Sequence, residues 1–162
     1  MKTKNMTISA MLVAIGVLGS QIIYIPVGAS KCFPVQHTIN IISAISLGPV
    51  YSVGIAFLIS LLRNILGVGS LLAFPGSMIG ALLAGLLFKF TSKRKMAILG
   101  EVFGTGILGG AMAFPIAKFI LGKDVAALFY VVPFLISTVG GSSIAYAILK
   151  LLDLSRITKK VL

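Results

Sequence analysis

The chain has 162 residues, of which 58% are hydrophobic and only 10% are charged, and its net charge is +11. A soluble domain of this size exposes more charged side chains than this composition supplies. The basic residues stand at the ends of apolar segments and do not line an aromatic-interleaved face, which argues against a nucleic-acid partner. We therefore expect an all-α integral membrane protein, with residues 1–162 forming a single membrane domain.

Six apolar segments are long enough, or nearly so, to cross a bilayer. A hydrocarbon core about 30 Å thick needs roughly 20 apolar residues per helix. The predicted spans are Thr7–Pro26, Val35–Leu47, Val50–Leu66, Leu71–Phe90, Ala97–Leu121 and Ala126–Leu152. The second and third are short and are joined by Gly48-Pro49, a strong turn signal. These two segments could instead form one re-entrant hairpin.

The basic residues predict the orientation of these spans. With six spans, ten of them fall on one side: Lys2, Lys4, Lys89, Lys93, Arg94, Lys95, Lys150, Arg156, Lys159 and Lys160. The other four, Lys31, Arg63, Lys118 and Lys123, fall on the opposite side. Because cytoplasmic loops carry the excess of Lys and Arg, we expect both termini to be cytoplasmic. A re-entrant hairpin would leave this parity unchanged.

A polar stretch, Gly28–Asn40, separates the first two spans and is expected outside the cell. It contains the only histidine and the only cysteine of the chain, His37 and Cys32. Two such residues without an acidic neighbour fall short of a zinc site, and a nucleophile–base pair lacks its third, orienting group. We therefore expect neither a metal site nor a catalytic site here, and a membrane-embedded enzyme using Cys32 or His37 is the weaker alternative.

Polar and aromatic residues of other spans are predicted to reach the same outer depth. Arg63 and Asn64 lie at the outer end of span three, although snorkelling to the interface would explain Arg63 equally well. Ala-Phe-Pro occurs twice, at Ala73–Pro75 and Ala113–Pro115, and both copies fall at the outer face. An aromatic belt accounts for some of these rings. Together with the polar stretch, however, they describe a small pocket suited to a flat, mostly neutral heterocycle.

Small residues in the spans indicate close helix packing. The run Gly104–Gly109 matches GxGxxG, but it lies inside an apolar span without the βαβ unit that dinucleotide binding requires. Glycines at four-residue spacing let helices approach closely, which explains the run better. Ala10 and Ala14 form a similar pair in span one, for which spacing alone favours internal packing over docking to another protein.

Glu101 is an acidic residue about one turn into span five. An ionisable residue within a membrane is a functional candidate by default. Here the positive end of its own helix, together with Arg94 and Lys95, is expected to satisfy the carboxylate near the cytoplasmic side. We therefore expect a structural role for Glu101.

Four runs of the sequence resemble the ThiW family over nearly the whole chain. They are PVGASKCFPVQHTIN, LGPVYSV, LLRNILGVGSLLAFPGSMIGALLAG and LGEVFGTGILGGAMAFPIAK. The family comprises substrate-binding (S) components of energy-coupling-factor (ECF) vitamin transporters. The resemblance implies a multi-pass protein of the bacterial plasma membrane that takes up hydroxyethylthiazole, the thiazole precursor of thiamine. It also implies the S-component fold, in which six helices form an outer pocket capped by the loop after helix one.

The resemblance implies partners as well. S components dock on a transmembrane coupling protein (T component) through an AxxxA motif in helix one, which Ala10–Ala14 matches, and this reverses the preference for internal packing. Two ATPase subunits use the ATP, so the chain itself would be no enzyme and would need no cofactor. Consistently, the sequence contains no Walker A motif.

The predicted site follows from depth and chemistry. We expect Phe33, Phe74 and Phe114 to enclose the ring, and Gln36, His37 and Asn40 to hydrogen-bond its nitrogen or hydroxyl. Arg63 and Asn64 would order the capping loop or contact the hydroxyl. A guanidinium in direct contact would favour a phosphorylated thiazole. An S component for the pyrimidine precursor of thiamine is the alternative within this class.

Overall fold

The computed structural model describes residues 2–27 and 30–161, with the side chains of Lys2, Ser30 and residues 153–161 left out. Gly28 and Ala29 of the predicted polar stretch therefore lie outside the described residues. The side chains of Arg156, Lys159 and Lys160, which contributed to the predicted orientation, lie outside them too.

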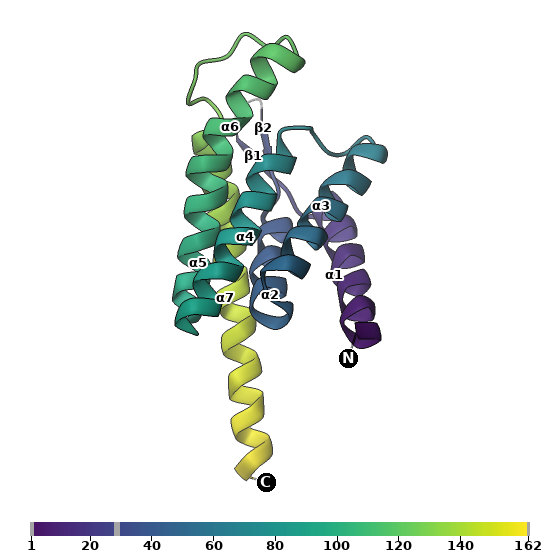
Figure 1. The fold of residues 1–162 in the computed structure, drawn as a ribbon, viewed down its shortest axis with the longest axis vertical. Coiled ribbons are helices and arrows are strands. Elements are labelled where there is room, and N and C mark those ends of the chain that lie inside the picture. The colour runs from purple at the N-terminus through teal and green to yellow at the C-terminus, as the bar shows by residue number, and fades with distance from the viewer. Residues whose placement is uncertain (1, 28–29, 162) are drawn as a thin grey trace.

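Helical segments that alternate in direction make up almost the whole fold, and both termini lie at the same end of the molecule (Figure 1). A short β-hairpin connects the first two helical segments at the opposite end. The segment from α5 to η2 is one continuous helix that contains two stretches of wider π-helix, η1 and η2. The elements are α1 Lys2–Ile22, β1 Ile25–Val27, β2 Ser30–Cys32, α2 Pro34–Leu47, α3 Pro49–Ile65, α4 Ala73–Thr91, α5 Arg94–Glu101, η1 Val102–Gly109, α6 Gly110–Pro115, η2 Ile116–Ile120 and α7 Val131–Val161.

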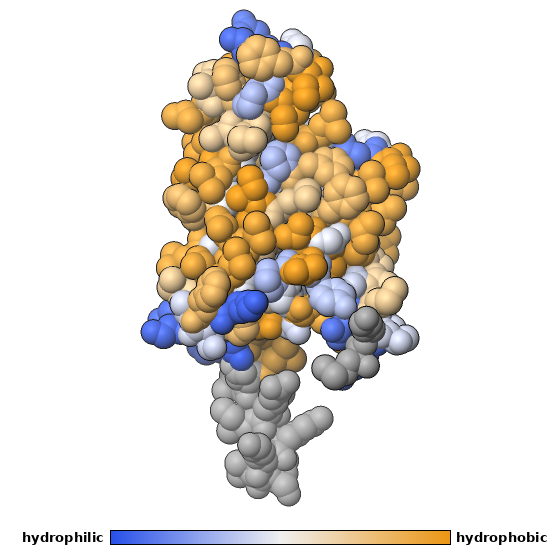
Figure 2. All heavy atoms as spheres, viewed as in Figure 1, coloured by the Kyte–Doolittle hydropathy of each residue, from blue (hydrophilic) through white to orange (hydrophobic). Residues whose placement is uncertain are grey.

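The lengths and apolar composition of the helices support the prediction of a membrane protein. Four of the described helical segments are long and apolar enough to cross a bilayer, namely Thr3–Ile22, Ala73–Thr91, Arg94–Ile120 and Val131–Leu152. Helix α2 has 14 residues, which at 1.5 Å per residue gives about 21 Å, less than the hydrocarbon thickness. Figure 2 shows an apolar surface over the middle of the molecule, with polar residues gathered toward both ends. A count of six full crossings stays a prediction.

The predicted turn between α2 and α3 is confirmed. Gly48 has φ +86°, a conformation that residues with a Cβ rarely adopt, and Pro49 begins α3. The turn packs against α4, because a Cβ on Gly85 would lie 2.5 Å from Pro49 Cα. Helices α2 and α3 are thus held as an antiparallel pair along α4.

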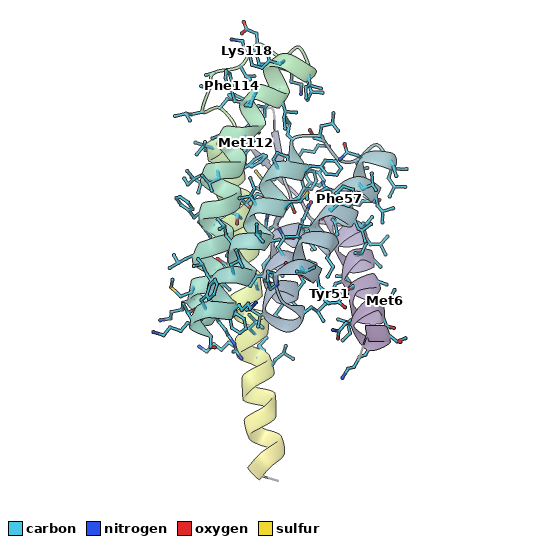
Figure 3. The ribbon with its side chains drawn as sticks, in the orientation of Figure 1. Met6, Tyr51, Phe57, Met112, Phe114 and Lys118 are labelled. Carbon is cyan, nitrogen blue, oxygen red and sulfur yellow. The ribbon has the colours of Figure 1, made fainter. Side chains whose placement is uncertain are left out.

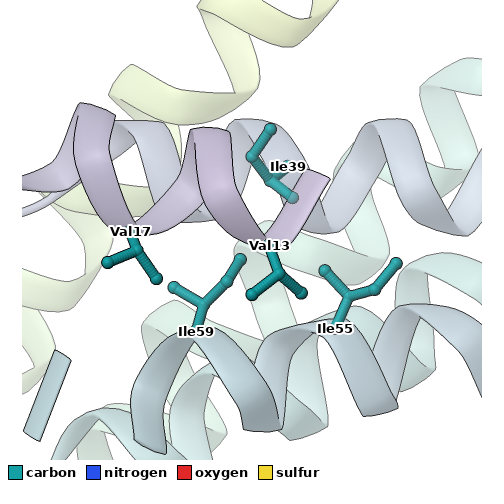
Figure 4. Packing of buried hydrophobic residues seen from close by; sticks show 5 residues of the cluster. All are labelled: Val13, Val17, Ile39, Ile55 and Ile59. Atoms are coloured by element: carbon teal, nitrogen blue, oxygen red, sulfur yellow. The ribbon is translucent and has the colours of Figure 1, made fainter. Parts of the chain in front are cut away.

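Helix α1 packs on α2 and α3 through one face only. Val13 and Val17 of α1 meet Ile39 of α2 and Ile55 and Ile59 of α3 (Figure 4). The opposite side of α1 carries exposed apolar residues, including Ala10, Met11, Ala14, Ile15 and Leu18. The Ala10/Ala14 pair therefore does not serve internal packing.

Glycines join α4 to η1, as the sequence predicted. A Cβ on Gly104 would lie 2.7 Å from Gly80 Cα, and a Cβ on Gly109 would collide with Gly76 Cα. These positions belong to the GxGxxG match, which therefore serves helix packing. The close approach also brings Thr105 and the end of α5 against the middle of α4, and so positions the site.

Candidate functional site

One face of α2 carries three buried polar side chains. Gln36, His37 and Asn40 are 2%, 8% and 0% exposed. Pro34 begins the helix directly after β2, so these residues occupy its first two turns. Since positions i, i+1 and i+4 face one side of a helix together, the three side chains can enter one hydrogen-bonded network.

Glu101 forms the acidic centre of this network. His37 Nδ1 lies 2.9 Å from Glu101 Oε1, Asn40 Nδ2 donates to the same oxygen at 3.0 Å, and Thr105 Oγ1 lies 3.0 Å away. The expectation that Arg94 and Lys95 would satisfy Glu101 was wrong. Helix α2 has only 14 residues, less than a full crossing needs, and its polar first turns lie at the level of Glu101.

Arg63 of α3 forms the other end of the network. It donates a hydrogen bond to Gln36 Oε1, and its guanidinium lies 3.8 Å from the centroid of the Phe33 ring. Gln36 in turn donates to Ser60 Oγ at 2.9 Å and to Ser77 Oγ at 2.8 Å. With Arg63 only 1% exposed, snorkelling into water does not describe it.

A cavity of about 650 Å³ lies on the hairpin side of this network. Its volume falls in the range of small-molecule sites, roughly 300–1,000 Å³. Aromatic rings form part of the wall, and three cationic side chains, Lys31, Arg63 and Lys123, border it. The aromatic residues are Tyr24, Phe33, Phe129, Tyr130 and Phe134.

A second cavity of about 50 Å³ lies deeper, against the network itself. Gln36, His37 and Thr105 are among its lining residues. Phe33 and Arg63 are among the residues that line both cavities, so their stacked pair lies at the boundary between the outer cavity and the inner one.

Four predicted site residues lie away from the residues that line the two cavities. Asn40 is held behind the network by Ser77 and Glu101, while Asn64 Nδ2 donates to the carbonyls of Ser60 and Ser70 and so braces the α3–α4 loop. The Phe74 ring packs 5.7 Å from that of Phe57, and Phe114 lies under Lys118 at the end of the molecule shown uppermost in Figure 3. Direct ligand contacts by these four stay predictions. The structure does bring together Phe33, Gln36, His37 and Arg63.

Several residues of the site were not predicted from the sequence. Ser60, Ser77 and Thr105 are small hydroxyl residues that occur throughout the spans, and only the folded arrangement distinguishes them. Glu101 carried a stronger signal, because it is an acidic residue in an otherwise apolar span. Its partner His37 was missed because the predicted spans put α2 and Glu101 at different depths in the membrane.

Cys32 is positioned as a structural thiol. It is 1% exposed, and its Sγ donates to the carbonyl oxygen of Pro133 at 3.1 Å. Burial raises the pKa of the Cys32 thiol above its ordinary value, which disfavours the nucleophilic thiolate. No group of three His, Cys, Asp or Glu side chains able to hold a metal ion occurs among the described residues.

Apolar helices surround an aromatic cavity with a buried polar floor, an arrangement typical of membrane proteins that bind a small molecule. The family described as "Thiamine-precursor transporter protein (ThiW)" matches residues 6–155. The chain belongs to this family, which implies transport of a thiamine precursor. No curated protein and no solved structure matches the chain significantly.

Proposed function

We propose that this protein is the substrate-binding S component of an ECF-type transporter and captures hydroxyethylthiazole at the outer face of the bacterial plasma membrane. The observation that carries the proposal is the pair of cavities joined at Phe33 and Arg63, in a chain of the thiamine-precursor transporter family. An aromatic wall suits a flat ring, and fixed polar groups suit its nitrogen and hydroxyl.

The roles of the individual residues follow from their positions. Phe33 offers a ring face at the boundary of the two cavities, where a thiazole would stack in place of, or next to, the guanidinium. Gln36 and His37 line the inner cavity and can donate or accept hydrogen bonds. The hairpin β1–β2 and the α3–α4 loop lie beside the outer cavity and would cover the bound ligand.

Transport requires partners in this proposal. Six spans with cytoplasmic termini would leave the cavities facing outward and the basic ends of the chain inside. The exposed Ala10/Ala14 face of α1 would dock on the T component, and two partner ATPases would supply the energy. The protein would bind and deliver substrate without chemically changing it, and no cofactor of its own would be needed.

A thermal-shift titration of the purified protein tests the ligand. Hydroxyethylthiazole, hydroxymethylpyrimidine and thiamine are added separately to the protein in detergent or nanodiscs. A ligand that binds only the folded state raises the unfolding temperature in a concentration-dependent manner. The proposal expects the largest rise with the thiazole. A larger rise with the pyrimidine would instead support an S component for the other half of thiamine.

A further inference from the structure

The buried guanidinium of Arg63 lacks an anionic partner. It is 1% exposed, and no carboxylate among the described side chains lies within ion-pair distance of it. Its hydrogen bonds go to the neutral oxygens of Gln36 and of the Val68 carbonyl, and Nε has no partner there. A buried charge is costly unless an opposite charge compensates it, and the neutral acceptors and the Phe33 ring face supply no negative charge for this guanidinium.

The nearest acidic group in the network, Glu101, forms no ion pair with Arg63, and its hydrogen bonds use one carboxylate oxygen only, because Oε2 is buried without a partner among the described residues. Glu101 Oε1 accepts hydrogen bonds from His37 and Asn40, and Arg63 reaches this part of the network only through Gln36 and Ser77. Glu101 is therefore hydrogen-bonded to the His37 side of the network and not to Arg63. The guanidinium of Arg63 lines both the outer and the inner cavity.

Two further cations border the same cavity. Lys31 of β2 and Lys123 of the η2–α7 loop line it together with Arg63, and no Asp or Glu is found among the described lining residues. Ser20 adds a buried hydroxyl without a partner in the described part of the chain. Guanidinium, ammonium and hydroxyl donors around an aromatic wall form a site for an anion attached to a ring.

We propose that the ligand carries an anionic group, phosphate or carboxylate, on the side arm of its ring, with the ring on Phe33 and the anion between Arg63, Lys31 and Lys123. This inference rests on the proposed function, because it takes the ring to be the thiazole of a thiamine precursor. The cavity of about 650 Å³ also leaves more room than the thiazole alcohol fills. The phosphate ester of hydroxyethylthiazole and a thiazole carboxylate are the two forms that such a site would favour over the alcohol.

Isothermal titration of the full-length protein in nanodiscs tests this inference. The ligands are hydroxyethylthiazole, its phosphate ester and the corresponding thiazole acetic acid, which separate phosphate from carboxylate as the anion. We expect at least one anionic ligand to bind about tenfold or more tightly than the alcohol, the range of one charge-assisted hydrogen bond. We expect Arg63→Gln to abolish that preference.

Matched lysine variants keep the test valid if Arg63→Gln fails to fold. Lys31→Gln and Lys123→Gln change exposed side chains of the cavity border and should reduce the preference for the anion. Lys118→Gln removes an exposed cation at the same end of the molecule that does not line the cavity, and should leave the preference unchanged. Equal or tighter binding of the alcohol would overturn this inference and leave the proposed function standing. Failure of all three ligands to bind would overturn both.

Discussion

His37 and Glu101, 64 positions apart in the chain, meet in the interior with Nδ1 2.9 Å from Oε1. The contact joins the first turns of α2 to the point where α5 passes into the π-helix η1. Asn40 and Thr105 bond the same carboxylate oxygen. One acidic residue thus fixes the relative positions of α2 and of the long helix that α5 begins, and the floor of the inner cavity depends on it.

Removing the carboxylate is expected to destabilise the protein. Glu101→Ala removes the acceptor of His37 Nδ1 and one of the acceptors of Asn40 Nδ2, and leaving a buried donor unsatisfied costs about 1–3 kcal/mol. Glu101→Gln keeps one acceptor oxygen of similar shape, so its loss of unfolding temperature should be smaller. Thermal unfolding in detergent measures both changes.

A double-mutant cycle isolates the contact itself. His37→Ala, Glu101→Ala and the double variant should show a coupling of about 1 kcal/mol or more, as found for contacting residues in one network. Additive losses would mean that the two side chains do not support one another. Ser143→Ala, on the exposed face of α7, is the control and should change little.

Gly80 is expected to tolerate no side chain. A Cβ there would collide with Thr105 Oγ1 and lie 2.7 Å from Glu101 Oε2, so Gly80→Ala should force α4 away from η1. Overpacking of this kind costs about 1–3 kcal/mol and would also disturb the inner cavity. Gly54→Ala is the matched control, because a Cβ at Gly54 meets nothing within 4 Å. Equal unfolding temperatures of the two variants would contradict the packing described for Gly80.

The sequence predicted the membrane class, the Gly48–Pro49 turn and the glycine packing, because each follows from local composition or spacing. The sequence also predicted that Gln36, His37 and Arg63 lie at a similar depth in the membrane. The partner of Glu101 was not predictable in this way, since depth was counted along spans assumed to cross fully. Helix α2 has only 14 residues, fewer than that assumption requires, and the polar network forms between residues whose sequence positions suggested opposite sides of the membrane.

The hairpin β1–β2 was also not foreseen. Its strands have only three residues each, Ile25–Val27 and Ser30–Cys32, too few to give an alternating pattern that sequence reasoning could detect. The pairing matters because it places Lys31 at the outer cavity and buries Cys32 against α7. One residue of the predicted polar stretch, Lys31, therefore lines the outer cavity, and its neighbour Cys32 attaches the hairpin to α7.

The thiol of Cys32 is expected to react slowly. Burial raises its pKa, so at neutral pH even less thiolate is present than in an exposed cysteine, and labelling should quicken only as the pH rises toward that raised pKa. Maleimide labelling of folded protein should be much slower than labelling after denaturation. Ser143→Cys in a Cys32→Ser background supplies an exposed thiol for comparison. Rapid labelling of native Cys32 would contradict its burial and revive the enzyme alternative.

The Ala10/Ala14 face of α1 is expected to serve uptake but not ligand binding. Both residues are exposed, whereas Gly16, two residues beyond Ala14, packs on Ile59 inside the protein. Leucines at positions 10 and 14 would add bulk only on the outer side of α1, where a partner helix has to approach closely. Ala10→Leu with Ala14→Leu should therefore abolish uptake by cells that contain the coupling protein and ATPases, while binding to the purified protein stays within about twofold of the parent.

A bulky residue on another exposed face separates docking from a general effect of added volume. Ala147→Leu places the same side chain on the exposed surface of α7 and should leave both uptake and binding unchanged. Gly16→Leu, in contrast, should lower the unfolding temperature because the new side chain meets the Ile59 core. Uptake that survives the double leucine change would place the docking face on a different helix. Loss of binding in that variant would show that the change in α1 disturbs the outer cavity itself, which Ser20 of the same helix lines, and does not act through a partner protein.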